Sequence, residues 1–316
     1  MDYLLFAIGL GGVLLGANIL VQGASRLAAR LGVPPIVVGL TIVGFGTSAP
    51  EIIVSGIASA TGDPDTALGN VVGSNVANIG LVLGVTALMS PMIPDRTVLR
   101  REGPVMVLVS VAFLLLAFSG EYTRWQGAIM LLVLAVFLYL SFRWSREDAP
   151  PAMLGDVEDI PVATGRAANI PLQIGYVVVG IAMLFGGGQA LIDGRDRHRG
   201  DVRHPQFVIA STLIAIGTSV PELATSVVAS MKKEADIAVG NVIGSNLFNL
   251  LAVLGIASVI ADIPIDTTVQ RLDMPIMVGF SVVALIFARS GHKMDRWEGA
   301  VLLVAYVSYM ALLLLR

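Results

Sequence analysis

The segment Gly46–Glu51 reads GTSAPE and the segment Gly217–Glu222 reads GTSVPE, each within an otherwise apolar stretch of the chain. A glutamate in the middle of a stretch long enough to cross a bilayer costs about 2.5 kcal/mol or more to insert. Such a residue is therefore interpreted first as functional and only then as part of the packing. Here that arrangement occurs twice. We therefore interpret the rest of the sequence around these two segments.

The proline of each segment predicts a break in the helix that carries it. Pro50 has no N–H and its ring crowds the preceding turn, so the carbonyl of Gly46 loses the hydrogen bond that it would accept. The freed carbonyl, the Thr47 hydroxyl and the Glu51 carboxylate share one side of the helix. The second segment has the same residue types at the same places. Each segment is thus an oxygen-rich half-shell, and hard cations such as Ca²⁺ and Na⁺ prefer oxygen ligands.

The composition indicates a protein that crosses a membrane many times. Of the 316 residues, 55% are hydrophobic and only 14% are charged, and the mean hydropathy is +0.82, which is too apolar for a soluble domain of this size. The absence of cysteine excludes disulfides, thiol redox chemistry and cysteine-bound zinc. The net charge of −3 gives no indication of a nucleic-acid partner. No basic residue precedes the first apolar run, so we expect a true span there and not a cleaved signal.

Ten apolar runs approach or reach the roughly 17–25 residues that a membrane-spanning helix needs. The first five are Leu4–Val21, Pro35–Ala60, Ala67–Ser90, Pro104–Phe118 and Gly127–Phe142, and the second five are Ile170–Ala190, Gln206–Met231, Ile237–Ile260, Met274–Ala288 and Gly299–Leu315. The sequence therefore predicts an all-α polytopic membrane protein with ten transmembrane helices.

The two sets of five runs are copies of each other at an offset of 171 residues. This offset carries Glu51 to Glu222, and it carries GNVVGSNVAN (Gly69–Asn78) to GNVIGSNLFN (Gly240–Asn249). A repeat with an odd number of spans must enter the membrane upside down relative to the first copy. The sequence thus predicts two inverted five-helix repeats with broken helices and a site at the bilayer midplane, as in many secondary transporters.

The repeat divides the chain into three parts. Residues 1–142 form the first predicted repeat, residues 170–316 form the second, and residues 143–169 form a flexible linker too short for a domain of its own. With the N-terminus outside, thirteen of the 20 Lys and Arg residues fall in inside loops, as the positive-inside rule expects, and the linker is cytoplasmic.

One stretch departs from the repeat. Residues Gly194–Pro205 read GRDRHRGDVRHP, whereas the matching stretch Gly23–Pro34 reads GASRLAARLGVP. The later stretch places four basic residues on the predicted outside, against the charge rule. Three interpretations stay open: a charged and solvated loop, a local reading-frame error that preserves length, or a regulatory or pH-sensing role for His198 and His204.

The acidic residues indicate what the site binds. Of the 23 acidic residues, only Glu51 and Glu222 fall inside the predicted spans, and these two spans contain no Lys or Arg. Carboxylates buried without a basic partner need a counter-charge, which a bound cation or a proton must supply. The repeat predicts that the two glutamates face each other, where one Ca²⁺ or two Na⁺ would neutralise them.

The second repeated element adds neutral oxygens. Ser74 and Asn78 are four residues apart and share a helix face, and the same holds for Ser245 and Asn249. The glycines of this element would also let another backbone approach closely. For this element alone, helix packing and ion binding are both open interpretations.

Together these residues resemble a known family. The doubled GTSAPE/GTSVPE and GNVVGSNVAN/GNVIGSNLFN elements, in a layout of five plus five spans, look like the α-repeats of the cation/Ca²⁺ exchanger superfamily, specifically its prokaryotic sodium/calcium exchangers. The resemblance covers Leu4 to Leu315. It implies antiport by alternating access in a prokaryotic inner membrane. Ca²⁺ and Na⁺ would be the transported ions, at one Ca²⁺ site and several mutually exclusive Na⁺ sites, with no organic cofactor.

The resemblance also implies a set of ion ligands, carried over by motif match. These are Thr47, Ser48, Glu51, Ser74 and Asn78 with the backbone of Gly44, and Thr218, Ser219, Glu222, Ser245 and Asn249 with the backbone of Ala215. Family members often have an aspartate where this chain has Asn249. That difference removes a possible third acid and leaves the ion stoichiometry and the counter-ion open.

Two other functions remain to be compared with Na⁺/Ca²⁺ exchange. In an H⁺/Ca²⁺ exchanger the two glutamates would take protons in place of Na⁺, and a passive cation channel lined by the same acids would need no counter-ion. Co-transport of K⁺ and the oligomeric state are not specified by the residues. An enzyme is disfavoured, because the spans hold no nucleophile and base pair and all three histidines lie in loops.

Overall fold

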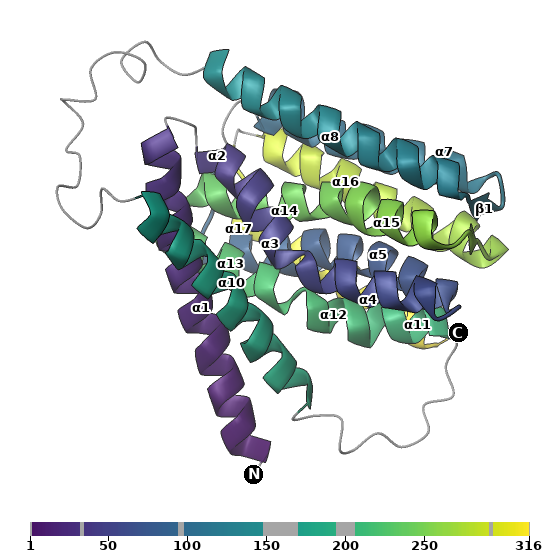
Figure 1. Ribbon diagram of the computed structural model, residues 1–316, viewed down its shortest axis with the longest axis horizontal. Coiled ribbons are helices and arrows are strands. Elements are labelled where there is room, and N and C mark those ends of the chain that lie inside the picture. Colours follow the sequence, from purple (N-terminus) through teal and green to yellow (C-terminus); the bar gives the residue numbers. More distant parts are fainter. Residues whose placement is uncertain are drawn as a thin grey trace.

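The computed structural model describes residues 2–31, 35–93, 98–147, 170–193, 206–290 and 293–315. The stretch with His198 and His204, and the linker beyond Glu147, lie outside these described residues. The described chain is almost entirely helical and has one two-stranded antiparallel sheet (Figure 1).

The described residues of the first half of the chain form twelve elements. In order they are α1 (Asp2–Leu31), α2 (Pro35–Val38), η1 (Gly39–Val43), α3 (Gly44–Thr47), α4 (Ala49–Ala60), α5 (Pro64–Ala77), η2 (Asn78–Leu83), α6 (Gly84–Met89), η3 (Val98–Glu102), α7 (Gly103–Ala117), β1 (Glu121–Tyr122) and α8 (Arg124–Glu147), where η denotes a π-helical segment. Helix α8 therefore continues five residues beyond the end of the predicted span at Phe142.

The second half repeats this order in its helical elements, whereas its strand comes earlier, before the last π-helical segment. Its elements are α10 (Ile170–Asp193), α11 (Gln206–Ile209), η6 (Ala210–Ile214), α12 (Ala215–Thr218), α13 (Val220–Met231), α14 (Ala235–Phe248), η7 (Asn249–Val253), α15 (Leu254–Ile260), β2 (Ile263–Pro264), η8 (Val269–Asp273), α16 (Met274–Arg289) and α17 (Arg296–Leu314). Strand β1 pairs with β2, and an isolated bridge pairs Met92 with Met294. Each of these pairings joins a connecting segment of the first half to one of the second half.

The described residues contain seven helices long and apolar enough to cross a membrane, or nine if each of two bent pairs counts as one span. These nine correspond to nine of the ten predicted runs. The tenth run, Pro104–Phe118, coincides with α7, which has only 15 residues. A helical membrane protein is therefore confirmed, while the count of ten spans stays a prediction.

The predicted breaks lie where the prolines stand. The pair α2–α3 and α4 is bent by 44°, and the pair α11–α12 and α13 by 41°. The residue at each break is a serine, Ser48 or Ser219, whose backbone leaves the helical conformation at φ −83°, ψ 5° and φ −84°, ψ 3°. Pro50 and Pro221 follow in the first turn of the next half-helix, where a missing N–H costs no hydrogen bond.

The π-helical segments recur in pairs at the same offset of 171 residues. Segment η1 matches η6, η2 matches η7, and η3 matches η8. Wide turns of this kind are rare and occur mostly near functional sites. Segments η2 and η7 begin at Asn78 and Asn249, two of the predicted ligands. The sequence pattern did not predict these turns.

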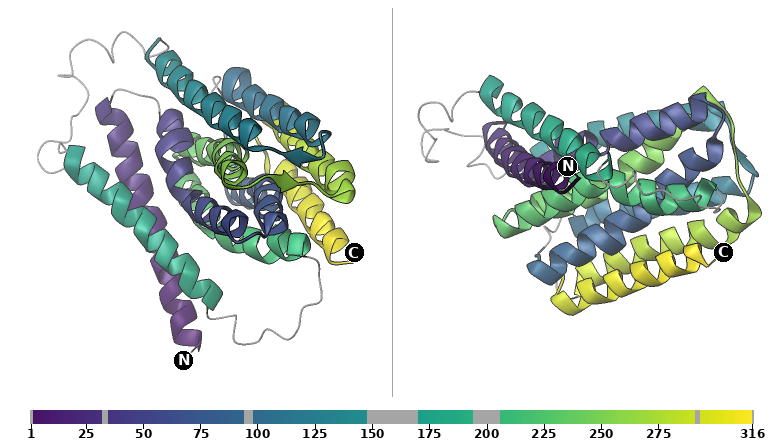
Figure 2. Two further views of the ribbon diagram at one scale, coloured as in Figure 1. Left: turned by 45° about the vertical axis from the view of Figure 1, so that its right-hand side comes forward. Right: turned by 90° about the horizontal axis from the view of Figure 1, so that it is seen from below.

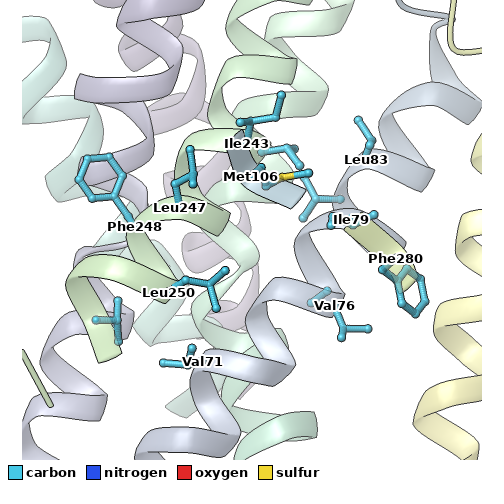
Figure 3. Close-up of a cluster of buried hydrophobic side chains, with 14 of the residues drawn as sticks. Val71, Val76, Ile79, Leu83, Met106, Ile243, Leu247, Phe248, Leu250 and Phe280 are labelled. Atoms are coloured by element: carbon cyan, nitrogen blue, oxygen red, sulfur yellow. The ribbon is translucent and has the colours of Figure 1, made fainter. Parts of the chain in front are cut away.

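Helices α5 and α14 form the centre of the bundle, and each packs against the broken helix of the other half. A methyl group added to Gly73 of α5 would lie 2.5 Å from a backbone oxygen of Ser211, and one added to Gly240 of α14 would lie 2.7 Å from that of Ile36. The expected close backbone approach is thus confirmed. Figure 3 shows buried apolar side chains of these two helices and their π-helical continuations, together with Met106 and Phe280 from neighbouring helices.

Helices α1 and α10 stand apart from this centre. They cross side by side at one end of the molecule, with the N-terminus at the tip of α1 (Figures 1 and 2). Gly16 of α1 meets the backbone of Gly180 on α10, which explains the close crossing. Gly46 at the first helix break lies against Ile181 of α10, so this pair contacts the centre next to the break.

Candidate cation-binding site

The structure brings the predicted ligands together in the interior. All twelve positions are buried, and eight of them have no exposed surface: Ser48, Glu51, Ser74, Asn78, Ala215, Glu222, Ser245 and Asn249. They come from the two helix breaks and from the middle of α5–η2 and α14–η7. The site therefore lies at the crossing of four helical segments, two from each half of the chain.

Side chains of the two halves alternate around the site. The Thr47 hydroxyl lies 3.3 Å from the Ser245 hydroxyl, and the Thr218 hydroxyl lies 3.5 Å from that of Ser74. Each contact joins residues more than 140 positions apart in the sequence. Neither half of the chain alone could assemble this set of oxygens.

The two carboxyls belong to one cluster, because Ser48, three residues before Glu51, contacts the carboxyl of Glu222. Oε1 of Glu222 accepts hydrogen bonds from Ser48 (3.3 Å) and Ser245 (3.4 Å). Both oxygens of Glu51 and Oε2 of Glu222 have no hydrogen-bond partner. No lysine or arginine of the described chain is among the groups that act on either carboxyl. The described part of the chain therefore leaves two buried acids without a counter-charge.

Asn78 and Asn249 add unpartnered amides to the same region. Both side chains are fully buried, and neither the oxygen nor the nitrogen of either amide has a hydrogen-bond partner. A buried polar group left unpaired costs roughly 1–3 kcal/mol. A cation bound to carboxylate, hydroxyl and amide oxygens would offset this cost, and oxygen-only ligation suits Ca²⁺ and Na⁺.

Among the described residues, only Glu51 and Glu222 contribute formal negative charges to this arrangement. Within the described ranges, no group of three or more His, Asp or Glu side chains is placed to hold a metal ion. Most of the oxygens here are neutral. Two charges balance either one divalent or two monovalent cations, so the site suits competition between ions of different charge.

The prediction that Glu51 and Glu222 are the only acids inside the spans is wrong. Besides Glu51 and Glu222, Asp273 and Glu298 are also buried within helices of spanning length, because these helices begin earlier than the apolar runs suggest. The protein supplies partners for both of these acids. Asp273 accepts a hydrogen bond from the Tyr309 hydroxyl (3.1 Å), and Glu298 accepts from the backbone N–H of Asp295 and from the hydroxyl of Ser290.

Two further residues of the site were missed. Asn70 and Asn241 are fully buried one turn before Ser74 and Ser245, and each contacts a predicted ligand of the opposite half. The signal that could have identified them is the repeat itself, because the offset of 171 residues carries one asparagine onto the other.

Comparison with known proteins identifies the family of this site. The sequence profile described as "Sodium/calcium exchanger protein" matches residues 1–143 and 172–315, which is most of the chain. The chain belongs to the sodium/calcium exchanger family. The resemblance found in the two repeated motifs is thereby confirmed.

Relatives of this exchanger cover its whole length. The putative antiporter CaxA of Alkalimonas amylolytica is 38% identical over 315 residues, 97% of this chain and 96% of the relative. The sodium/calcium exchanger MaX1 of Methanosarcina acetivorans is 33% identical and covers 99% of this chain and 98% of its own. Among solved structures, the sodium-calcium exchanger NCX_Mj matches with a TM-score of 0.82 at 28% identity, covering 98% of this chain and 97% of its own.

These findings establish the class of activity. The exchanger is a membrane transporter of an antiporter family, and its family is not one of catalytic enzymes. The structures of NCX_Mj were studied with Na⁺ and with Ca²⁺ or Sr²⁺. Ions of these charges match the two uncompensated carboxyls described above.

Proposed function

We propose that this chain is a secondary active antiporter that exchanges Ca²⁺ for Na⁺ by alternating access and exports Ca²⁺. The observation that carries the proposal is the pair Glu51 and Glu222. Both are fully buried, near each other and without a basic partner in the described chain, among hydroxyl and amide oxygens from both halves. Such a site needs a counter-charge from bound cations or protons.

Charge balance supplies the coupling. When Ca²⁺ or Na⁺ occupies the two carboxylates, the neutralised site can pass between inward-facing and outward-facing states. The empty site carries two buried charges and cannot, so ions move only in exchange for one another. An inward Na⁺ gradient then drives Ca²⁺ out of the cell.

The ligand set belongs to the same proposal. The carboxylates of Glu51 and Glu222 bind Ca²⁺. The other ten positions of the two motifs act as ligands of Na⁺ or Ca²⁺. Support comes from the burial of all twelve and from the unpartnered amides of Asn78 and Asn249. Asn249 in place of an acid limits the fixed charge to two, which favours a site that exchanges one Ca²⁺ against Na⁺.

The architecture that we propose is an inverted pair of five-helix repeats, residues 1–142 and 170–316, with the N-terminus outside a prokaryotic inner membrane. Residues 143–169 would then form a cytoplasmic linker. The recurrence of bends and π-helical segments at one offset supports the repeat. The odd number of predicted spans in each repeat supports the inversion.

Ca²⁺ flux into proteoliposomes under single imposed gradients tests this function. We expect an outward Na⁺ gradient to drive Ca²⁺ uptake, and K⁺ or H⁺ gradients alone to drive none. Uptake driven by a pH gradient without Na⁺ would instead establish an H⁺/Ca²⁺ exchanger. Flux in Na⁺-free vesicles at clamped pH would establish a channel. Empty liposomes and vesicles without a gradient serve as controls.

A further inference from the structure

Asn241 connects two parts of the site that the ligand motifs do not connect. Its side-chain nitrogen donates to the Ser226 hydroxyl (3.0 Å) and to the backbone carbonyl of Glu222 (3.3 Å). Its side-chain oxygen accepts from the Thr47 hydroxyl (3.0 Å). One amide therefore joins the half-helix that carries a glutamate to a threonine of the opposite half.

The same arrangement occurs a second time. The nitrogen of Asn70 donates to the Ser55 hydroxyl (2.9 Å) and to the backbone carbonyl of Glu51 (3.4 Å), and its oxygen accepts from the Thr218 hydroxyl (3.4 Å). Every residue of this set is related to its counterpart by the offset of 171. Both asparagines are fully buried, so these contacts do not compete with solvent.

The chemistry of a hydroxyl explains why such a contact matters. A threonine hydroxyl has one hydrogen to donate and two lone pairs, and a cation binds through a lone pair. The hydrogen must therefore point to another acceptor. For Thr47 the shortest such contact is to Asn241. The alternative acceptors are the Ser245 hydroxyl at 3.3 Å and the carbonyl of Gly44 at 3.4 Å, and both are themselves proposed ligands. By accepting the hydrogen, Asn241 leaves that carbonyl available to the cation.

We propose that Asn241 and Asn70 are positioning residues of the cation site. Each orients a threonine hydroxyl of the opposite half so that its lone pairs face the cation, and each fixes that threonine relative to a glutamate. This inference rests on the proposed function in one respect only, namely that the site binds cations. Asn241 carries the larger effect, since Thr218 has a shorter alternative contact, to the carbonyl of Ile214 at 3.1 Å.

Only an amide suits this position. A carboxylate would lack the two N–H donors and would face the carbonyl of Glu222 with a negative charge. A leucine has a similar volume but neither donor nor acceptor. Supporting contacts of this kind around metal ligands change affinity by about 10–100-fold when they are removed.

Direct Ca²⁺ binding to the purified, detergent-solubilised protein tests the inference. By titration calorimetry we expect Asn241→Leu to raise the Kd for Ca²⁺ about tenfold or more. The matched control is Asn246→Leu on the same helix. Asn246 is equally buried, but its nitrogen bonds only the carbonyl of Val242 in its own helix (2.9 Å), so its Kd should stay within about twofold.

A second variant, Thr47→Val, distinguishes a positioning role of Asn241 from general structural damage. If Asn241 acts through the Thr47 hydroxyl, Asn241→Leu should add little to the Kd of a Thr47→Val variant. Independent structural damage would add in full. Should Asn241→Leu not fold, Asn70→Leu with Thr218→Val is the equivalent pair, with a smaller expected shift.

Each outcome of this experiment is decisive. An unchanged Kd in Asn241→Leu, an equal loss in Asn246→Leu, or full additivity with Thr47→Val would overturn the inference. Wild-type protein that binds Ca²⁺ but shows no Na⁺-driven flux would overturn the proposed function and leave the inference standing. Wild-type protein that binds no cation would overturn both.

Discussion

Glu51 and Glu222 occupy matching positions in the two halves of the exchanger, yet their carboxyls have different surroundings. Glu222 accepts hydrogen bonds from Ser48 and Ser245, one from each half. Glu51 accepts none, and Ser219, the counterpart of Ser48, makes no hydrogen bond through its hydroxyl. The site is thus symmetric in residue type but asymmetric in contacts. A transporter built from inverted repeats needs this asymmetry, because two identical halves could not face one side of the membrane at a time.

The apolar surroundings differ more than the polar site does. Ile79, Leu83, Met106 and Ile243 line an apolar cavity beside the central helices, together with Ala284. Figure 3 shows the first four of these side chains. The counterpart of Ala284 in the first half is Phe113, whose ring is buried and stacks on Tyr122. Ligand positions must match in both halves because each supplies oxygens. Packing positions need only fill volume, and here the two halves fill it differently.

The largest expected effect comes from substituting the two glutamates themselves. Glu51→Gln and Glu222→Gln keep the size of the side chain but remove one of the two charges that the cations balance. We expect each variant to lower Na⁺-dependent uptake of radioactive Ca²⁺ by about 100-fold or more, as the loss of a charged hydrogen-bonding ligand costs several kcal/mol.

The two variants should fold, because removing an unbalanced buried charge relieves a cost. Size-exclusion profiles and thermal unfolding of the purified variants provide the control. Near-normal flux in both variants would show that these carboxyls are not the coupling site.

The next largest effect tests the apolar difference. Phe113→Ala removes a buried ring, and we expect it to cost about 3–5 kcal/mol and to lower Tm in detergent by roughly 10 °C. Ala284→Met adds a side chain next to an existing cavity, so its Tm should stay within about 3 °C of the wild type. A large loss of stability in Ala284→Met would show that the cavity is not free space.

The sequence predicted the helix breaks and the two buried glutamates because both depend on local features. A proline inside an apolar run ends a helix wherever the run lies, and an acid such as Glu51 is costly in any bilayer. The π-helical segments and the early start of the helix at Asp273 were not predictable in this way. Their geometry depends on contacts with distant helices, and single-residue preferences carry no information about them.

Asn70 and Asn241 show the same limit within the site. An asparagine in a helix resembles any small polar residue, and its partner Thr47 is 194 positions away from Asn241. Only the folded chain brings the two together. The repeat could have marked the asparagines as a pair, but it could not have distinguished a ligand from a residue that orients one.

The smallest expected effect concerns the two serines at the helix breaks, which differ in their hydrogen bonds. Ser48 donates to Glu222, whereas Ser219 has no hydrogen-bond partner, although both are buried. A hydrogen bond to a charged group contributes about 1.5–3 kcal/mol, which corresponds to about a tenfold or larger change in affinity. We therefore expect Ser48→Ala to raise the Kd for Ca²⁺ at least about tenfold and Ser219→Ala to raise it less. Calorimetric titration of both variants decides the point. Equal shifts would mean that both serines act only as direct ligands, and that the asymmetry around Glu222 has no part in binding.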